Sequence, residues 1–440
     1  MSTSTIFARA SGAGRAGVAV FRLSGPQAGE ALVSLTGSRG EPRYARRVTV
    51  RDQGGVIDDG LALWFPAPHS FTGEDVVELH LHGSLAVEAR LDEALLALGL
   101  EHAGPGAFTM RAFAQGKLDL TQTEGLRDLL EAETTLQHKQ ALRHMRGELR
   151  GLADQWRKDL VEAMAMLDAA VDFPDEHDVP GGIAEQALPA VERVRASLTD
   201  AMAGAVKARH VREGFRVAII GPPNAGKSTL FNQIVESERA IVSPEAGTTR
   251  DAITERLEIG GHLVTLIDTA GIRESTTSSI EGEGVKRAEE AARLADLRLL
   301  AWPSDGGPVA DWLAALGEDG DLHLATKADL AAPRQGVLAL PRQGALAVSA
   351  TDSATIERLL RRLKKRLDER AAPGLAPSKR QQTLLTAAID DLSRFQAGDT
   401  APEVLSEILR AAARHLEVLT GRIAPDDILD DIFSSFCIGK

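Results

Sequence analysis

The sequence predicts a mixed α/β and α-helical protein: a small α+β domain, a helical domain, and a doubly wound α/β domain inserted into the helical domain. Three observations lead to this fold class. Short apolar runs separated by Gly and Pro fill residues 1–117, and apolar residues at helical spacing fill residues 118–211 and 373–440. Between them, over residues 212–372, predicted strands alternate with predicted helices.

The first 117 residues are predicted to form the α+β domain. Residues 18–23 and 76–81 are rich in Val, Leu and Phe, as strands are, and residues 85–98 have the pattern of an amphipathic helix. This stretch is long enough for a core of its own.

Helical periodicity defines the two flanking segments. Apolar residues step by three or four from Leu142 to Val171, as on one face of a long helix, and a second helical stretch covers residues 186–209. After a joint rich in Pro and Ala at residues 371–374, the periodicity returns. Two separate helical domains would show the same pattern, so the insertion is a hypothesis.

The central segment has the order of a doubly wound sheet. Its helices are predicted at residues 227–235 and 355–367, and its strands at residues 216–220, 253–259, 263–268, 297–301, 322–325 and 345–349.

Composition indicates a soluble, cytoplasmic protein. Apolar residues make up 43% of the 440 and charged residues 26%. The single cysteine, Cys437, allows no intramolecular disulfide, and we expect neither a secretory signal nor a membrane span. The net charge of −13 favours a nucleic-acid role that is local or shared with a more basic partner, or no such role.

A phosphate-binding loop follows the first strand of the central segment. Residues 221–228 read GPPNAGKS and open the next helix, which is the setting this motif requires. The backbone N–H groups of such a loop point at phosphates. Lys227 is predicted to reach the β- and γ-phosphates, and the Ser228 hydroxyl to ligate Mg²⁺.

Two further motifs predict that the nucleotide is GTP. Asp268 begins the string DTAG at a strand end, where it would hold Mg²⁺, and Gly271 would sense the γ-phosphate. The string TKAD ends with Asp329, whose carboxylate can accept hydrogen bonds from guanine N1–H and N2–H₂, which adenine lacks. Ser349 and Ala350 would support guanine O6. These motifs together predict a Ras-like G domain.

Two positions depart from the common pattern of such domains. Thr326 stands where the guanine-reading string usually has Asn, which bears on affinity more than on base identity. Ile272 follows the DTAG string and has no hydrogen-bonding group, so another residue must orient the attacking water. In residues 247–251, Thr249 is the candidate second hydroxyl ligand of Mg²⁺ in the GTP state.

The chain resembles the MnmE family, also called TrmE, of tRNA modification GTPases. The strings that carry the resemblance run through the whole chain: GRAGVAVFRLSG from Gly14, SFTGEDVVE from Ser70, PGAFTMRAF from Pro105, GKLDLTQ from Gly116, and FCIGK from Phe436. The resemblance implies a potassium-activated GTPase whose G domains pair in the GTP state. It also implies a homodimer through a folate-binding-like N-terminal domain.

The resemblance assigns roles in hydrolysis. K⁺ would be held by Asn224, Ser243, Glu245 and Thr248, in place of an arginine finger. Glu281 would orient the water, although from the residues alone it is one acid among several. With Lys227 and Thr249, it completes the predicted catalytic set in the G domain. The predicted GTP-binding residues are Asn224, Ala225, Gly226, Lys227, Ser228, Thr229, Ser243, Pro244, Glu245, Ala246, Gly247, Thr248, Thr249, Asp268, Thr269, Ala270, Gly271, Thr326, Lys327, Ala328, Asp329, Ser349, Ala350 and Thr351.

The resemblance also implies a tetrahydrofolate ligand, in a 5-formyl or 5,10-methylene form. Arg22, Glu78, Lys117 and Lys440 match the family positions. From the residues alone they could equally be surface charges of a small domain. Cys437 is either a reactive thiol near this ligand or a small buried residue.

The implied reaction adds an aminomethyl or carboxymethylaminomethyl group to carbon 5 of the wobble uridine, U34, of tRNA. The implied partner is MnmG (GidA), which carries FAD and forms a heterotetramer with the homodimer. Two alternatives stay open: a switch GTPase for ribosome assembly or another RNA-associated process, and a folate-dependent aminomethyl transferase whose G domain is inactive. The first would call for a basic RNA-binding appendage, and the intact phosphate-binding loop argues against the second.

Overall fold

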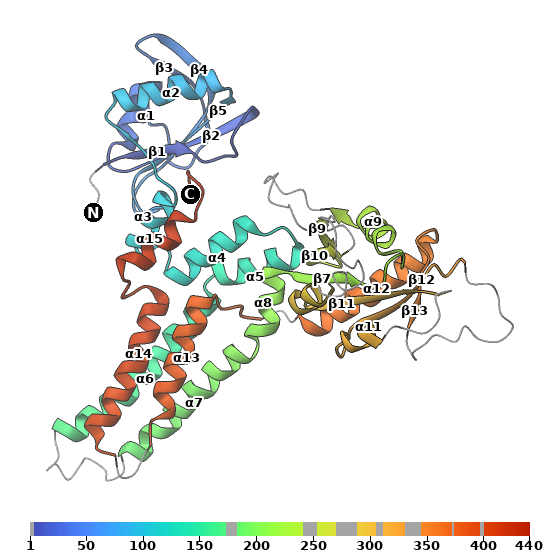
Figure 1. Cartoon of the computed structure of the whole chain (residues 1–440). Helices are drawn as coiled ribbons and strands as arrows, with labels where there is room; N and C mark the ends of the chain where they lie inside the picture. The colour runs from blue at the N-terminus through green and yellow to red at the C-terminus, as the bar shows by residue number, and fades with distance from the viewer. Residues whose placement is uncertain are drawn as a thin grey trace, which may run out of the picture. The chain divides into compact units, whose positions relative to one another are not determined.

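The computed structural model describes residues 4–172, 183–240, 253–269, 288–304, 311–330, 345–371, 374–396 and 400–440. The chain divides into two compact units, each made from several segments (Figure 1). The first unit contains residues 1–127, 144–192 and 387–440, and the second contains residues 128–143 and 193–386. No described helix has both the length and the apolar character needed to cross a membrane.

The N-terminal part of the first unit is a six-stranded sheet with the order β3-β4-β5-β2-β1-β6. Its strands are antiparallel except for the β1–β6 pair. The elements are β1 Ile6–Arg9, β2 Ala16–Ser24, α1 Ala28–Thr36, β3 Arg46–Asp52, β4 Gly55–Phe65, β5 Val76–Gly83, α2 Leu85–Ala97, β6 Glu101–His102 and α3 Ala107–Ala114.

Alternation along β2 and β5 separates the two faces of this sheet. Phe21 and Leu23 of β2 share one buried cluster with Val77 and Leu79 of β5 and with residues of α1 and α2. Arg22 and Glu78 occupy the alternate positions and are directly paired in register. They therefore lie on the face opposite α1 and α2.

The rest of the first unit is helical. Helix α6 (Glu148–Asp172) packs along α14 (Pro402–Thr420), where Arg157 is 3.0 Å from Glu417 and Ser406 donates to Asp168 at 2.6 Å. The chain ends after α15 (Asp426–Ser434). Helices α4 (Leu120–Glu131), α7 (Ile183–Ala203) and α13 (Lys379–Ser393) each contain residues of both units.

Two predicted helices are interrupted in the structure, which corrects the sequence analysis. The apolar face that begins at Leu142 belongs first to α5 (Thr135–Met145) and then to α6. Gly147 lies between the two helices, and its φ of 85° is incompatible with one continuous helix. The stretch predicted at 186–209 is divided at Gly204 into α7 and α8 (Ala205–Glu213). The apolar periodicity of the sequence continues across both of these positions, so it does not reveal where one helix ends and the next begins.

The second unit contains a seven-stranded sheet with the order β13-β12-β11-β7-β10-β9-β8. The five strands from β13 to β10 are parallel, and β9 and β8 are antiparallel additions. The elements are β7 Phe215–Ile220, α9 Lys227–Ser237, β8 Arg239–Ala240, β9 Ile253–Ile259, β10 His262–Asp268, β11 Leu297–Pro303, α11 Asp311–Ala315, β12 Leu322–Thr326, β13 Leu346–Ala347 and α12 Ser353–Arg370.

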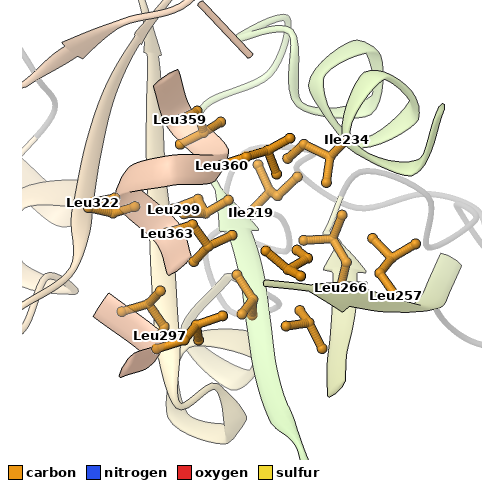
Figure 2. Packing of buried hydrophobic residues seen from close by; sticks show 14 of the residues in the cluster. Ile219, Ile234, Leu257, Leu266, Leu297, Leu299, Leu322, Leu359, Leu360 and Leu363 are labelled. Atoms are coloured by element: carbon orange, nitrogen blue, oxygen red, sulfur yellow. The ribbon is translucent and has the colours of Figure 1, made fainter. Parts of the chain in front are cut away.

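Both faces of this sheet are covered, as in a doubly wound fold. On one face, Ile219 of β7 packs with Ile234 of α9 and with leucines of α12 (Figure 2). On the other face, Ala218 and Ile220 pack with residues 288–295 and with Leu313 of α11. The Ras-like α/β fold class is confirmed, whereas the domain boundaries at residues 117, 211 and 372 stay predictions.

Candidate functional site

The phosphate-binding loop connects β7 to α9, as the motif predicts. Gly221 follows β7, and a Cβ atom on it would lie 2.1 Å from the Ala301 carbonyl oxygen of β11, so only glycine fits. Asn224 has a φ of 59° and Gly226, the N-cap of α9, a φ of 82°. These left-handed conformations are ones that Asn and Gly adopt most readily, and they curl the loop over the helix N-terminus.

Lys227 lies in the first turn of α9 and points back into this loop. Its ammonium donates to the carbonyl oxygens of Gly221 and Pro222, both at 3.0 Å. Burial lowers the pKa of Lys227, and the nearby Asp268 carboxylate acts in the opposite direction. A phosphate would supply the negative charge that the two carbonyl groups supply only in part.

The Mg²⁺ ligands predicted in the described residues lie at the same edge of the sheet. Asp268 is the last residue of β10, is 1% exposed, and influences the Lys227 ammonium electrostatically. Thr269 follows it and donates to the Ile219 carbonyl oxygen of β7 at 2.8 Å, which joins the two strand ends. Ser228 is exposed at the start of α9. A buried carboxylate near an exposed hydroxyl is an oxygen donor set that suits Mg²⁺.

The guanine-reading string is tied to the phosphate-binding loop by the residue that departs from the usual pattern. The Thr326 hydroxyl is 4% exposed and lies 2.6 Å from the Ala225 carbonyl oxygen and 2.9 Å from that of Trp302. The hydroxyl has one proton, so it donates to one of the two carbonyl oxygens or is shared between both. Thr326, where the sequence departs from the usual Asn, therefore links the guanine-reading string to the phosphate-binding loop.

Asp329 is exposed, and its carboxylate is oriented by the loop after β13. The buried Ser349 hydroxyl donates to Asp329 Oδ1 at 2.7 Å and lies 2.8 Å from the Thr351 hydroxyl. Lys327 has a φ of 55°, and its side chain packs against Gly226. Ala328 donates to the Val348 carbonyl oxygen, which joins the segments that follow β12 and β13.

Ten predicted site residues fall outside the described residues. They are Ser243, Pro244, Glu245, Ala246, Gly247, Thr248, Thr249, Ala270, Gly271 and Glu281. Their predicted roles stay predictions.

The N-terminal residues predicted for a folate ligand lie in the first unit. Arg22 Nη2 is 2.8 Å from Glu78 Oε1, and the His80 ring is 3.5 Å from the other carboxylate oxygen. The guanidinium carbon of Arg22 lies 5.5 Å from the ring centre of Phe71 and 5.8 Å from that of Phe108. Contacts of a cation with two aromatic rings favour one position of the side chain while it stays partly exposed.

The C-terminus reaches this face of the sheet. Phe108 donates its backbone N–H to the Lys440 carbonyl oxygen at 3.1 Å, and Ile438 forms a bridge with Pro105. A Cβ on Gly439, whose φ is 94°, would lie 2.2 Å from the Arg9 carbonyl oxygen, so the tail fits closely.

Lys440 shares the charges of this site. Burial and then the Arg22 guanidinium lower the pKa of Lys440, while Glu78 and Cys437 raise it. Arg22, Glu78, Lys440 and Cys437 are therefore within electrostatic reach of one another. Arg22 and Lys440 are the cations of this set, and cations of this kind suit a ligand with carboxylates of its own, such as the glutamate tail of a folate.

Cys437 and Lys117 differ from the other members of this set. Cys437 is exposed, which removes the alternative of a buried structural thiol. Lys117 is exposed as well, and its side chain runs beside Gly73. Sequence reasoning did not single out Phe71 and Phe108, although both lie in strings that carried the resemblance.

Comparison with known proteins covers the whole chain. Residues 5–117 match a family model described as the GTP-binding protein TrmE N-terminus, and residues 120–437 match one described as the MnmE helical domain. A tRNA modification GTPase MnmE of Paramagnetospirillum magneticum is 46% identical over 442 residues, which cover 99% of each chain. One from Phenylobacterium zucineum is 45% identical over 448 residues, again with 99% of each chain covered. Among solved structures, the G domain of the T. maritima FeoB iron transporter covers 36% of this chain and 99% of its own, at 23% identity and a TM-score of 0.26, too low to bear on the fold.

Proposed function

Because the chain belongs to the MnmE (TrmE) family of tRNA modification GTPases, we propose that its GTPase activity drives the modification of the wobble uridine, U34, of tRNA. The product carries an aminomethyl or carboxymethylaminomethyl group at carbon 5. A tetrahydrofolate derivative, 5-formyl or 5,10-methylene, supplies the one-carbon unit when it is bound. GTP hydrolysis changes the conformation and does no chemistry on the base.

The nucleotide is held by the loop between β7 and α9. Lys227 leaves the carbonyl groups of Gly221 and Pro222 for the β- and γ-phosphates, whose negative charge favours its ammonium form. Ser228 and Asp268 hold Mg²⁺, and Thr249 joins them in the GTP state. Asp329, oriented by Ser349, selects guanine over adenine because adenine leaves the carboxylate unpaired.

Hydrolysis depends on K⁺ in this proposal. The Asn224 side chain is exposed at the tip of the loop and has no hydrogen-bond partner in the described part of the chain, so its oxygen can bind a cation. Ser243, Glu245 and Thr248 complete the shell, and Glu281 orients the water. A cation at this place stabilises the charge that develops on the phosphoryl oxygens.

The face of β2 and β5 with the C-terminal tail holds the folate. Lys440, Lys117 and Arg22 meet its carboxylates and carbonyl oxygens, and Glu78 accepts hydrogen bonds from the amide and amine edge of the pterin. Cys437, exposed beside this set, is the candidate thiol for the transfer. The support is geometric: Arg22 pairs with Glu78 at 2.8 Å on this face, and the Lys440 backbone carbonyl is held by Phe108 beside it.

The proposed assembly has three parts. Two copies of this chain pair through their N-terminal domains, MnmG (GidA) binds the pair and carries FAD, and tRNA is the substrate of the complex. The proposed location is the cytoplasm.

The first experiment measures steady-state GTP hydrolysis in KCl and in NaCl at equal ionic strength. We expect strong activation by K⁺ that is lost in Asn224→Gly. Glycine is the informative substitution, since it adopts the φ of 59° at this position without strain, so the side chain with its oxygen is removed while the loop conformation is kept. Asn224→Asp keeps an oxygen and should keep part of the activation.

Equal rates in both salts would show that a protein group supplies the charge. Arg250 and Arg273 are then the residues to test. Folate binding is checked separately by titrating the full chain with 5-formyltetrahydrofolate: Glu78→Gln and Arg22→Gln should weaken it, and Arg366→Gln should not.

A further inference from the structure

Helix α12 has two contrasting faces. Its inner face carries Ile356, Leu359, Leu360, Leu363 and Leu367, all buried in the core of the second unit. Leu359, Leu360 and Leu363 point toward the sheet in Figure 2. The outer face is therefore held in a fixed orientation by the packing of the inner one.

The outer face is strongly basic. Residues 357–366 hold six cations and one acid, in a chain whose net charge is −13. Four of these cations line a surface hollow of about 290 Å³ together with Leu346 of β13: Arg358, Arg361, Arg362 and Lys365. We call these four residues the basic face.

Three cations of the basic face, Arg358, Arg361 and Lys365, have little charge opposite them in the described residues. Arg361 is 3.6 Å from Glu357, and both side chains are about 70% exposed, so this pair contributes little. Arg358 and Lys365 form no ion pair within the described ranges. The nearest acids further along the helix pair with other cations: Asp368 with Lys364, and Glu369 with Arg366.

From this geometry we infer that the basic face of α12 binds the phosphate backbone of RNA, and that tRNA is the RNA it meets. The inference rests on the proposed function for the choice of tRNA. From Arg358 to Lys365 the helix rises about 10.5 Å, at roughly 1.5 Å per residue, so the cations are spread along more than one phosphate. Backbone contacts of this kind position a nucleic acid without reading its sequence.

The packing of α12 disfavours a membrane surface as the ligand. A helix that lies in a bilayer needs a free apolar face, and the apolar face of α12 is buried in the protein core. An acidic protein is the remaining alternative ligand for the basic face, and the experiment below distinguishes it from RNA.

The basic face is also connected to the loop after β13, in which Ser349 orients Asp329. Leu346 lies three residues before Ser349, and α12 begins two residues after Thr351. RNA on this face would therefore contact both elements that carry the loop orienting Asp329. Bound RNA would therefore act on the nucleotide site through only a few residues.

The test measures binding of unmodified tRNA to the full chain with GDP, between 50 and 200 mM KCl. The variant replaces Arg358, Arg361 and Lys365 by Gln together. We expect its affinity to fall at least about tenfold at low salt, and the slope of log K against log [salt] to become shallower by about 2 to 3, since each lost phosphate contact removes roughly 0.7–0.9. GTP turnover without RNA should not change.

The matched control removes three exposed cations elsewhere, Lys158, Arg193 and Arg414, and should bind tRNA as the unchanged protein does. Equal loss in both triple variants would overturn the inference, because only net charge would then matter. Unchanged binding in the α12 variant would overturn it too, as would polyglutamate that competes as well as RNA of equal charge. K⁺-dependent GTP turnover and folate binding are independent of all three outcomes, so the proposed function would stand.

Discussion

At the scale of single residues, Thr326 joins two segments that lie far apart in the sequence. Its hydroxyl reaches the Ala225 carbonyl oxygen at 2.6 Å, so the guanine-reading string and the phosphate-binding loop are joined directly. Lys327, packed against Gly226, brings the same two segments together. The two ends of a bound nucleotide would thus contact one connected unit.

Thr326→Val should therefore weaken both the fold and nucleotide binding. Valine has the same shape but no hydroxyl, which leaves the buried carbonyl oxygens of Ala225 and Trp302 without this donor. We expect the free energy of unfolding to fall by roughly 1–3 kcal/mol and GDP affinity to fall with it. Chemical denaturation and titration with fluorescent GDP measure the two effects.

Thr326→Ser is the matched control, because it keeps the hydroxyl. It should retain most of the GDP affinity. If Val and Ser variants bind GDP alike, the tether has no functional role.

At the scale of elements, β11 is fixed to the loop before β12 by a buried ion pair. Arg298 Nη1 lies 3.3 Å from Asp321 Oδ2, and the two side chains are 6% and 0% exposed. Asp321 also accepts the backbone N–H groups of Arg298 and Glu318, at 3.0 and 2.8 Å. The carboxylate is thus the centre of the turn that sets β11 beside β12.

Arg298→Met should destabilise the second unit by about 3–5 kcal/mol, because it leaves the Asp321 charge buried without its partner. The double variant with Asp321→Asn should regain part of that loss, since it removes the buried charge. Thermal unfolding of the full chain measures both.

An exposed pair on α12 provides the comparison. Arg366→Met breaks the contact with Glu369, where both side chains are more than 40% exposed, and should cost less than about 0.5 kcal/mol. Equal destabilisation by Arg298→Met and Arg366→Met would contradict the burial argument.

At the scale of the whole molecule, the chain brings its last residue to its second strand. Residues 22 and 440 share one electrostatic site, and the tail from Cys437 to Lys440 is held by Phe108 and by the close fit of Gly439. A site made from both ends of the chain forms only when the first unit is complete. Folding and ligand binding are therefore coupled there.

This coupling predicts a pH dependence. The pKa of Lys440 in the folded chain lies below its ordinary value of 10.5, so between the two values the unfolded chain holds more protons at this residue. Raising the pH through this window therefore stabilises the folded state. Below the window, the full cost of the buried charge remains.

Comparison of the unchanged protein with Lys440→Gln isolates this residue, since Lys227 titrates in both. As the pH rises toward 10.5, the melting temperature of the unchanged protein should rise relative to that of the variant. Differential scanning fluorimetry from pH 7.5 to 10 measures it. Parallel curves would mean that Lys440 is not buried among these charges.

The sequence by itself determined the G-domain fold class, the phosphate-binding loop and the alternation of strands and helices along the chain around it. These features are local: left-handed turns at Asn224 and Gly226 and a helix that starts at Lys227 are encoded within a few residues. The long strings that carry the family resemblance are equally local, and the comparisons confirm the family.

Only the tertiary structure decided which distant residues meet. The pairing of Arg22 with Glu78 depends on the register of β2 and β5, and the approach of Lys440 depends on the path of the last helix. The hydrogen bond from Thr326 to Ala225 joins residues that are 101 positions apart in the sequence. Each of these contacts is set by packing between separate elements, and a short stretch of sequence does not specify the partner against which it will pack.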